Sequence, residues 1–334
     1  MSAEYLGHVS HTDPLYEYFK YEIQPQFSNN RRVDYRVFRQ NGSSDVYLYE
    51  EKYSGVKFLG KFFLTAKQPN REKAAIRMER EFHHLHFMRS LGFNHSPHYI
   101  AAPLGKNSDL NQLLVEEFCY GELMGNMLLR SLHNNDSDLL YRKLTVLAYF
   151  LSEFHNPTAN GIGVNFNEAC AYLSSLLTQL HSQTLIDWQG KQNFYHLMDN
   201  WRNRACVWED NEVIVHGDAT PGNFLFGDGL NVISFDLERL RRADRVHDVG
   251  RVSAELAHFF MLNTGDRYRA EPFIGHFLWE YACHFPDREK AFYSITARIP
   301  FYMGMNFLRI ARNNYLSWPY RQRLVHEAWE CFRR

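Results

Sequence analysis

The chain has 334 residues, and its 37 lysines and arginines against 38 aspartates and glutamates leave a formal net charge of −1. This balance gives no electrostatic reason to expect a nucleic acid or an anionic membrane as a partner. With 45% hydrophobic and 22% charged residues, the composition indicates a globular protein rather than a disordered one, and the length predicts about two domains or lobes.

Sorting signals and cysteines give the expected location. The first residues contain no basic segment followed by an apolar run, so we expect no secretory signal peptide. No apolar stretch approaches the ~18 residues of a membrane-spanning helix. The five cysteines are scattered and form no Cys-x-x-Cys pair, which argues against a disulfide framework and a zinc-thiolate site. We therefore expect a protein of the reducing cytoplasm, and the sequence leaves its oligomeric state open.

Strand patterns dominate the chain up to about residue 120. Residues 70–91 are the exception, because their hydrophobic positions have helical spacing. We predict a small β-rich lobe with one main helix at residues 31–120, preceded by an N-terminal extension at residues 1–30. Alternating hydrophobic residues predict short strands in this lobe at 34–38, 45–49, 56–64, 98–104 and 113–118.

After Gly121 the hydrophobic spacing becomes mostly helical, with one β-rich interruption at residues 212–236. This pattern predicts an α+β protein whose second lobe, residues 121–334, is large and mostly helical. Its clearest predicted helices lie at about 136–156, 168–182, 190–206 and 243–262.

The strongest chemical signal is the polar loop His216-Gly217-Asp218-Ala219-Thr220-Pro221-Gly222-Asn223 between two β runs. Asp218 and Asn223 have the D-x-x-x-x-N spacing of a kinase catalytic loop, and the second β run ends at Asp236. Magnesium prefers hard oxygen ligands, so Asn223 and Asp236 are candidate metal ligands. Asp218 is then the candidate for taking or orienting the proton of an acceptor hydroxyl. The alternative is that these residues only cap turns.

The HGDxxxxN loop followed by a strand-borne aspartate resembles the aminoglycoside phosphotransferase and choline kinase family, relatives of the protein kinases. Identifiable motifs of the resemblance cover about residues 33–260, and the rest matches only in being helical. The resemblance implies a two-lobed protein-kinase-like fold. It also implies magnesium-assisted transfer of the γ-phosphate of ATP, with GTP as an alternative, to a hydroxyl group of a small molecule.

The resemblance requires a lysine in the small lobe. The segment from Gly55 to Phe62 offers Lys57 and Lys61, and it narrowly misses the P-loop pattern because Phe62 stands where that pattern has a serine or threonine. Lys61 lies late in a predicted strand and precedes two phenylalanines, as in the family. We therefore assign Lys61 to the nucleotide phosphates and expect Lys57 to be a solvated surface residue.

The family also pairs this lysine with a glutamate, and helical geometry selects Glu81. Met78 and Leu85 mark the inward face of the helix predicted at 70–91, and Glu81 lies within the same arc. Glu79 lies outside it. Because an inward carboxylate needs a partner, we predict that Glu81 pairs with Lys61.

The remaining nucleotide contacts follow from the resemblance. Ser43 and Ser44 stand where the family has a phosphate-binding turn, although a plain hairpin explains them equally well. The segment around Glu116 and Phe118 resembles the hinge whose backbone binds adenine. Asp248 matches an aspartate that braces the catalytic loop, and helix N-capping is an alternative role that is compatible with the first.

Two other functional classes compete with this prediction. A protein kinase is disfavoured because Asp236-Leu237-Glu238 replaces Asp-Phe-Gly and because only twelve positions separate Asp236 from Asp248, which leaves no room for an activation loop. A nucleotide-binding pseudokinase or scaffold remains the alternative, although all the expected catalytic residues are present.

The charge of the last helices bears on the acceptor. Residues 267–334 contain eleven lysines and arginines against six acidic residues. A polycationic aminoglycoside requires the opposite balance around its pocket. We therefore predict a neutral or anionic hydroxyl compound as acceptor. The alternative is that these arginines lie on solvated helix faces.

Overall fold

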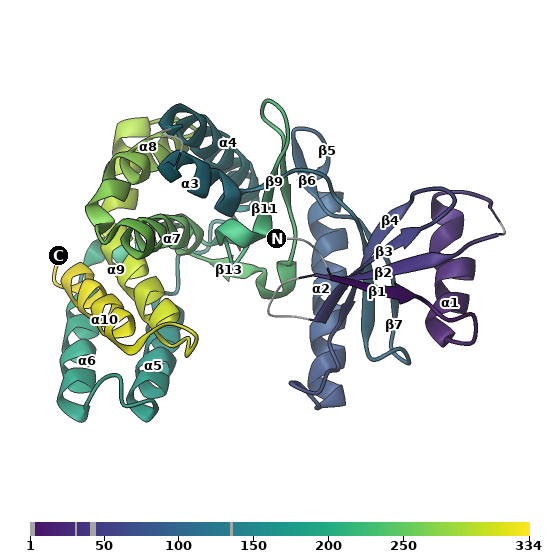
Figure 1. Cartoon of the computed structure of the whole chain (residues 1–334). Coiled ribbons are helices and arrows are strands. Elements are labelled where there is room, and N and C mark those ends of the chain that lie inside the picture. The colour runs from purple at the N-terminus through teal and green to yellow at the C-terminus, as the bar shows by residue number, and fades with distance from the viewer. Residues whose placement is uncertain (1–3, 31, 41–44, 134–135) are drawn as a thin grey trace. The chain divides into compact units, whose positions relative to one another are not determined.

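The computed structural model describes residues 4–30, 32–40, 45–133 and 136–334. The chain divides into two compact units (Figure 1). The β-rich unit contains the residues up to Glu122 together with Leu225–Arg239. The helical unit contains Leu123–Phe224 and Leu240–Arg334. The β-rich unit therefore includes a short segment that the sequence-based boundaries assign to the large lobe.

A six-stranded sheet forms the core of the β-rich unit. Its strands follow the order β1-β2-β3-β4-β8-β7, and every neighbouring pair is antiparallel. Their bounds are β1 (Glu4–His8), β2 (Tyr35–Arg39), β3 (Asp45–Glu51), β4 (Lys57–Phe62), β7 (Pro103–Asn107) and β8 (Leu113–Glu117). The strands predicted at 34–38, 45–49, 56–64 and 113–118 are confirmed, whereas the run at 98–104 is divided between β7 of this sheet and a strand of a second sheet.

The two faces of this sheet have different roles. Phe58 of β4 belongs to an aromatic core on one face, where it packs with Phe19, Tyr35 and Tyr49. Because side chains alternate along a strand, Lys61 points to the other face. There helix α2 (Arg71–Ser90) packs along β7 and β8 (Figure 1).

Helix α2 matches the helix predicted at 70–91. Asn70 caps its first turn by accepting a hydrogen bond from the backbone N–H of Lys73 at 2.8 Å. The buried face consists of Ala74, Met78, Glu81, Leu85 and Met88. Helical periodicity therefore places a carboxylate in the interior beside the sheet.

Residues 4–30, which we expect from the sequence to form part of an N-terminal extension, contribute directly to the sheet. Strand β1 forms its edge by pairing with β2, and helix α1 (Pro14–Tyr18) follows with Asp13 as N-cap. The sequence signal for β1 is weak because the strand is short and Gly7, with φ of 118°, stands at an irregularity of its register.

A second, smaller sheet carries the strand that precedes Asp236. Its order is β5-β6-β12-β11-β9, and β12 runs parallel to β6. The bounds are β5 (Asn94–His95), β6 (His98–Ile100), β9 (Glu122–Leu123), β11 (Phe224–Phe226) and β12 (Val232–Ser234).

The other unit is mostly helical, as predicted. Two short antiparallel strands, β10 (Val213–Val215) and β13 (Arg241–Ala243), lie in it, and β10 leads into the His216–Asp218 loop. Its helices are α3 (Met124–His133), α4 (Ser137–His155), α5 (Phe166–Ser182), α6 (Trp188–Arg202), α7 (Val246–Thr264), α8 (Glu271–Ala282), α9 (Arg288–Ala311) and α10 (Trp318–Phe332).

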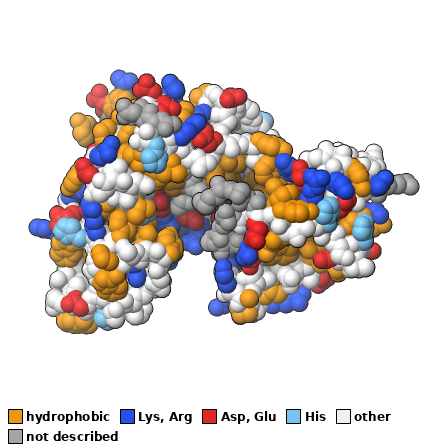
Figure 2. Space-filling view, in the orientation of Figure 1, with side chains coloured by type: hydrophobic (Ala, Val, Ile, Leu, Met, Phe, Trp, Pro, Cys, Tyr) orange, Lys and Arg blue, Asp and Glu red, His pale blue; other side chains and the backbone are white. Residues whose placement is uncertain are grey.

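The surface and the cysteines agree with the composition. Basic and acidic side chains are interspersed over the face shown in Figure 2. All five cysteines are free. None of the helices formed by the described residues combines the length and apolar character that crossing a membrane requires.

Candidate active site

The loop after β10 is held by a buried carboxylate. Asp248, in the first turn of α7, accepts hydrogen bonds from the backbone N–H groups of His216 at 2.6 Å and Gly217 at 3.0 Å. Gly217 has φ of 78°, a conformation that favours glycine. The predicted bracing role of Asp248 is therefore confirmed. The alternative role as N-cap does not apply, because Arg245 precedes the helix at that position.

Two histidines stabilise the charge of Asp248. His155 and His247 contact its carboxylate at 3.2 and 3.4 Å. Burial alone opposes ionisation, but these hydrogen bonds outweigh it and hold the pKa of Asp248 well below its usual range. Burial also lowers the pKa of His155, and it lowers that of His247 to about 4. The brace thus consists of an ionised aspartate and two histidines whose neutral forms are favoured.

Asn223 closes the loop that begins at Asp218. Its side-chain Nδ2 donates to the backbone carbonyl of Asp218 at 2.8 Å, which turns the amide oxygen away from that carbonyl. The residue is buried at the end of a short 3-10 turn, Pro221–Asn223. The structure therefore brings the two predicted loop residues together.

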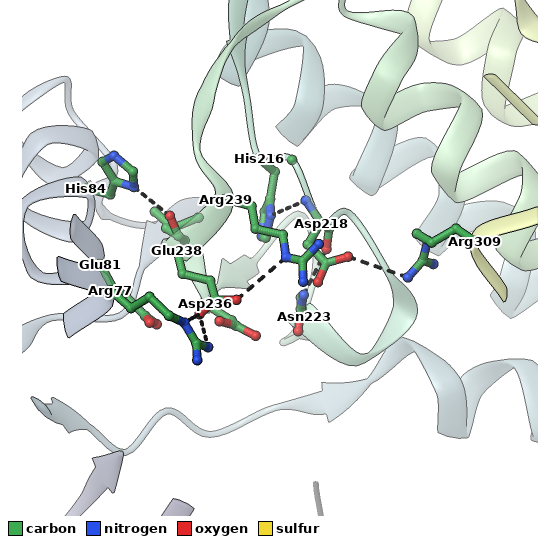
Figure 3. Close-up of polar contacts among 12 residues, drawn as sticks. Arg77, Glu81, His84, His216, Asp218, Asn223, Asp236, Glu238, Arg239 and Arg309 are labelled. Carbon is green, nitrogen blue, oxygen red and sulfur yellow. Dashed lines mark hydrogen bonds and ion pairs between the residues drawn. The ribbon is translucent and has the colours of Figure 1, made fainter. Parts of the chain in front are cut away.

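Two arginines of the helical unit lie at Asp218, and sequence reasoning assigned neither of them to the site. Nη1 of Arg251 in α7 donates to Oδ1 of Asp218 at 2.6 Å and also to the carbonyl of Gly217. Nη1 of Arg309 in α9 lies 3.9 Å from the same carboxylate oxygen (Figure 3). Helices α7 and α9 pack together, and this packing, rather than a sequence motif, produces the arrangement.

The β-rich unit holds the second group of predicted residues. Nζ of Lys61 donates to Oε1 and Oε2 of Glu81 at 2.8 and 2.7 Å, and to Oδ1 of Asp236 at 2.8 Å. The predicted pairing of Lys61 with Glu81 is confirmed. Lys57 instead lies 3.7 Å from Glu50 and is partly exposed.

Asp236 has an unusual backbone. It follows β12 with φ of 61°, a left-handed conformation that costs energy for a residue other than glycine. Such strain is common where a fold must present a functional side chain. Two residues later, Glu238 accepts hydrogen bonds from Nε and Nη2 of Arg77 at 3.2 and 2.6 Å (Figure 3). Oxygen atoms of Glu81, Asp236 and Glu238 lie within 4.8 Å of one another.

A third carboxylate, that of the buried Glu116 in β8, interacts electrostatically with Lys61. Burial raises the pKa of Glu116 to about 7; the charge of Asp236 adds to this effect and the attraction of Lys61 opposes it. For Lys61 burial also opposes the charge, but Glu81 and Asp236 outweigh it and raise the pKa of Lys61. The ammonium group of Lys61 thus interacts with the carboxyl groups of three acidic residues, Glu81, Asp236 and Glu116. The resemblance predicts a role only for the backbone of Glu116, not for its side chain.

The other predicted nucleotide residues are placed as follows. Phe118 directly follows the last residue of β8, and its ring meets that of Tyr120 edge-on at 4.9 Å. Ser43 and Ser44 lie outside the described residues.

The chain is similar to known phosphotransferases. A family model described as the phosphotransferase enzyme family, APH, matches residues 34–284. No curated protein matches the chain in sequence.

Several solved structures share the fold. An ethanolamine kinase of Plasmodium vivax is 13% identical with a TM-score of 0.61, covering 97% of this chain and 88% of its own. A choline kinase of Cryptosporidium parvum Iowa II is 11% identical with a TM-score of 0.60, covering 96% and 92%. An ADP-bound aminoglycoside phosphotransferase is 16% identical with a TM-score of 0.56, covering 96% and 97%. Since the family model spans most of the chain, from the second sheet strand to helix α8, the chain belongs to the phosphotransferase enzyme family.

Proposed function

We propose that the chain is a small-molecule kinase that transfers the γ-phosphate of ATP to a hydroxyl group. The observation that carries the proposal is the ion-pair cluster in which Lys61 contacts both Glu81 and Asp236. In phosphoryl transfer a lysine held in this way binds the nucleotide phosphates. The braced loop containing Asp218 supplies the group that faces the acceptor.

The proposed reaction is a direct displacement at phosphorus. The acceptor oxygen forms a bond to the γ-phosphorus while the bond to the β,γ-bridging oxygen breaks, and ADP leaves with that oxygen and its electron pair. Asp218 orients the acceptor hydroxyl and accepts its proton, which then passes to solvent. Because Arg251 and Asp248 fix the loop, Asp218 is positioned before the acceptor arrives.

The donor set fits magnesium. Asp236 and Asn223 offer a carboxylate and an amide oxygen, which are hard ligands, and the hydrogen bond from Nδ2 of Asn223 fixes the orientation of its amide. We propose that these two residues hold the ion. When bound, magnesium neutralises charge that develops on the phosphate oxygens. Lys61 binds the same phosphates, and Glu81 holds the ammonium group of Lys61 in position.

We further propose that the backbone of Glu116 and Phe118 binds adenine and that Ser43 and Ser44 contact phosphate. The position of these first two residues at the end of β8 supports the hinge assignment. ATP is the proposed donor, and GTP is the alternative. We propose a neutral or anionic acceptor, because the guanidinium groups of Arg251 and Arg309 lie at Asp218.

The test is acceptor-dependent transfer from γ-labelled ATP to a panel of sugars, hydroxy acids, amino alcohols, nucleosides and aminoglycosides. We expect labelled product from at least one compound with the wild type, and none with Asp236→Ala. Asp228→Ala, in an exposed turn, is the matched control and should behave like the wild type. Nucleotide binding without transfer to any acceptor would instead favour the pseudokinase.

A further inference from the structure

One nitrogen of Arg309, Nη1, has no hydrogen-bond acceptor among the described residues. Its Nε donates to Oδ1 of Asn306 at 3.2 Å, and its Nη2 donates to Glu255. Nη1 lies 3.9 Å from Oδ1 of Asp218, which is beyond hydrogen-bond distance (Figure 3). Among the described residues no other acceptor reaches Nη1. The N–H groups of Nη1 therefore remain available to a ligand close to the proposed catalytic carboxylate.

The position of Arg309 is fixed before any ligand binds. Oδ1 of Asn306 accepts from Nε of Arg309 and from Nε of Arg251 at 2.9 Å, while its Nδ2 donates to the carbonyl of Tyr302 at 2.8 Å. Arg251 is buried, with 1% of its side chain exposed, whereas Arg309 is 13% exposed. Arg251 thus positions Asp218, and Arg309 is the arginine that a ligand can reach.

A second donor lies in the same region. The hydroxyl group of Tyr172 in α5 is buried and has no hydrogen-bond partner in the described structure. Tyr172 also interacts electrostatically with Arg251, the arginine that positions Asp218. A buried hydroxyl without a partner is costly, which makes Tyr172 a candidate second donor to a ligand held by Arg309.

The ion pairs already formed at Asp218 and Arg309 indicate the charge that the ligand should have. The carboxylate of Asp218 is paired with Arg251, and that of Glu255 is paired with Arg309. The groups that remain to be satisfied, Nη1 of Arg309 and the hydroxyl of Tyr172, are donors. A cationic ligand would therefore find carboxylates that are already neutralised, whereas an anionic ligand would supply the missing acceptor atoms.

We propose that Arg309 and Tyr172 bind an anionic group, a carboxylate or a phosphate, carried by the acceptor whose hydroxyl Asp218 orients. The inference rests on the proposed function, because it takes Asp218 as the group that receives the acceptor. It narrows the acceptor from neutral or anionic compounds to hydroxylated anions. It also separates the expected substrate from the cationic ones of amino-alcohol kinases and aminoglycoside phosphotransferases.

Equilibrium binding tests the anion site without catalysis. Glycerate and inorganic phosphate are titrated by calorimetry into the full chain loaded with Mg-ADP. We expect one of them to bind the wild type, at least ~10-fold weaker binding to Arg309→Ala, partial recovery in Arg309→Lys and a smaller loss in Tyr172→Phe. Arg312→Ala, at the C-cap of α9 three residues further along the chain, is the matched control and should bind like the wild type. Equal binding by the wild type and Arg309→Ala, or no binding of either anion by the wild type, would overturn the inference.

Transfer assays distinguish this inference from the proposed function. Glycerol, glycerate, glycerol 3-phosphate and ethanolamine are offered with Mg-ATP. We expect the anionic compounds to be preferred and Arg309→Ala to raise their KM at least ~10-fold. Transfer to ethanolamine alone would overturn the inference that the acceptor is anionic, but it would support the proposal that the chain is a small-molecule kinase. Loss of phosphate binding whenever ATP replaces ADP would assign the site to the γ-phosphate and would also overturn it. If the wild type binds the anion in an Arg309-dependent manner but does not bind ATP, only the proposed kinase function is contradicted.

Discussion

Nη1 of Arg251 donates to Oδ1 of Asp218 at 2.6 Å from within the helical core, where 1% of the arginine side chain is exposed. This bond fixes the orientation of the proposed catalytic carboxylate. The same nitrogen also binds the carbonyl of Gly217, so one guanidinium holds both the side chain and the backbone of the loop. Arg251 is therefore a positioning residue, because it acts on the reaction through Asp218.

Substitution of Arg251 should separate positioning from nucleotide binding. We expect Arg251→Met to lower kcat by about 100-fold or more, with little change in KM for ATP, because the misplaced carboxylate no longer orients the acceptor. Breaking a buried pair also destabilises the fold by about 3–5 kcal/mol, so urea unfolding must accompany the assay. Arg251→Lys should recover part of the lost kcat. An unchanged kcat in a folded Arg251→Met variant would contradict the positioning role.

The assignment of Lys61 to the nucleotide predicts a contrast between the two lysines of strand β4. Lys61→Ala should lower kcat/KM for ATP by about 100-fold or more, because it removes the group that contacts both Glu81 and Asp236. Lys57→Ala should remain within a few-fold of the wild type, because that lysine forms a partly exposed ion pair with Glu50. Steady-state kinetics with varied ATP measures both. The reverse outcome would mean that Lys57 serves the nucleotide.

The same contrast exists on helix α2. Glu81→Gln removes a buried carboxylate from Lys61 and should reduce kcat/KM for ATP by about 10-fold or more. Glu79→Gln is the matched control, because Glu79 is partly exposed and pairs with Lys106 at the surface. Equal kinetics for the two variants would show that the buried pair does not serve the nucleotide.

The burial of His247 beside Asp248 predicts that the fold loses stability in acid. Burial lowers the pKa of His247 to about 4, while the unfolded chain has the ordinary value near 6.5. The unfolded state therefore binds more protons between these values, and stability falls as the pH decreases below about 6.5. Linkage gives a loss of roughly 2 kcal/mol from this residue between pH 8 and pH 5. His247→Asn should lose correspondingly less stability over that range, as urea unfolding at both pH values would measure. An identical pH dependence would exclude His247 as its source.

The contribution of Glu116 to stability should have the opposite pH dependence. Burial raises its pKa to about 7, so the folded state binds more protons than the unfolded state between about pH 4.5 and pH 7. This contribution favours the fold at low pH and is lost as the pH rises. Glu116→Gln, which cannot ionise, should therefore be more stable than the wild type by about 1–3 kcal/mol at pH 8.5 and similar to it at pH 4.5. A less stable Glu116→Gln at pH 8.5 would indicate that its carboxylate supports Lys61.

The sequence predicts well the parts of the site that depend on local spacing. Helical periodicity places Glu81 on the buried face of α2, and strand alternation places Lys61 on the matching face of the sheet. The spacing from Asp218 to Asn223 corresponds to a loop closed by a hydrogen bond between them. Each of these features is predictable because it depends on a spacing of a few residues or on the regular repeat of a helix or a strand.

The parts that the sequence does not predict depend on tertiary packing. Arg251 and Arg309 come from helices α7 and α9, and neither belongs to a motif that relates it to Asp218. The burial of the Glu116 side chain is also not predicted, because glutamates are usually exposed to solvent. Its interaction with Lys61 is not predicted either, because that lysine belongs to another strand. Residues 4–8 join the sheet through pairing with β2, which a short segment with a glycine does not reveal.

Single-turnover transfer by wild type and Asp218→Asn is the most direct test of the central claim that Asp218 serves the acceptor in a phosphotransfer reaction. Asparagine keeps the size of the side chain but cannot accept the hydroxyl proton. With labelled ATP and the best acceptor of the panel, we predict that Asp218→Asn is slower by about 100-fold or more while its affinity for Mg-ATP and its unfolding midpoint stay near those of the wild type. Equal rates of product formation by the two proteins would contradict the account.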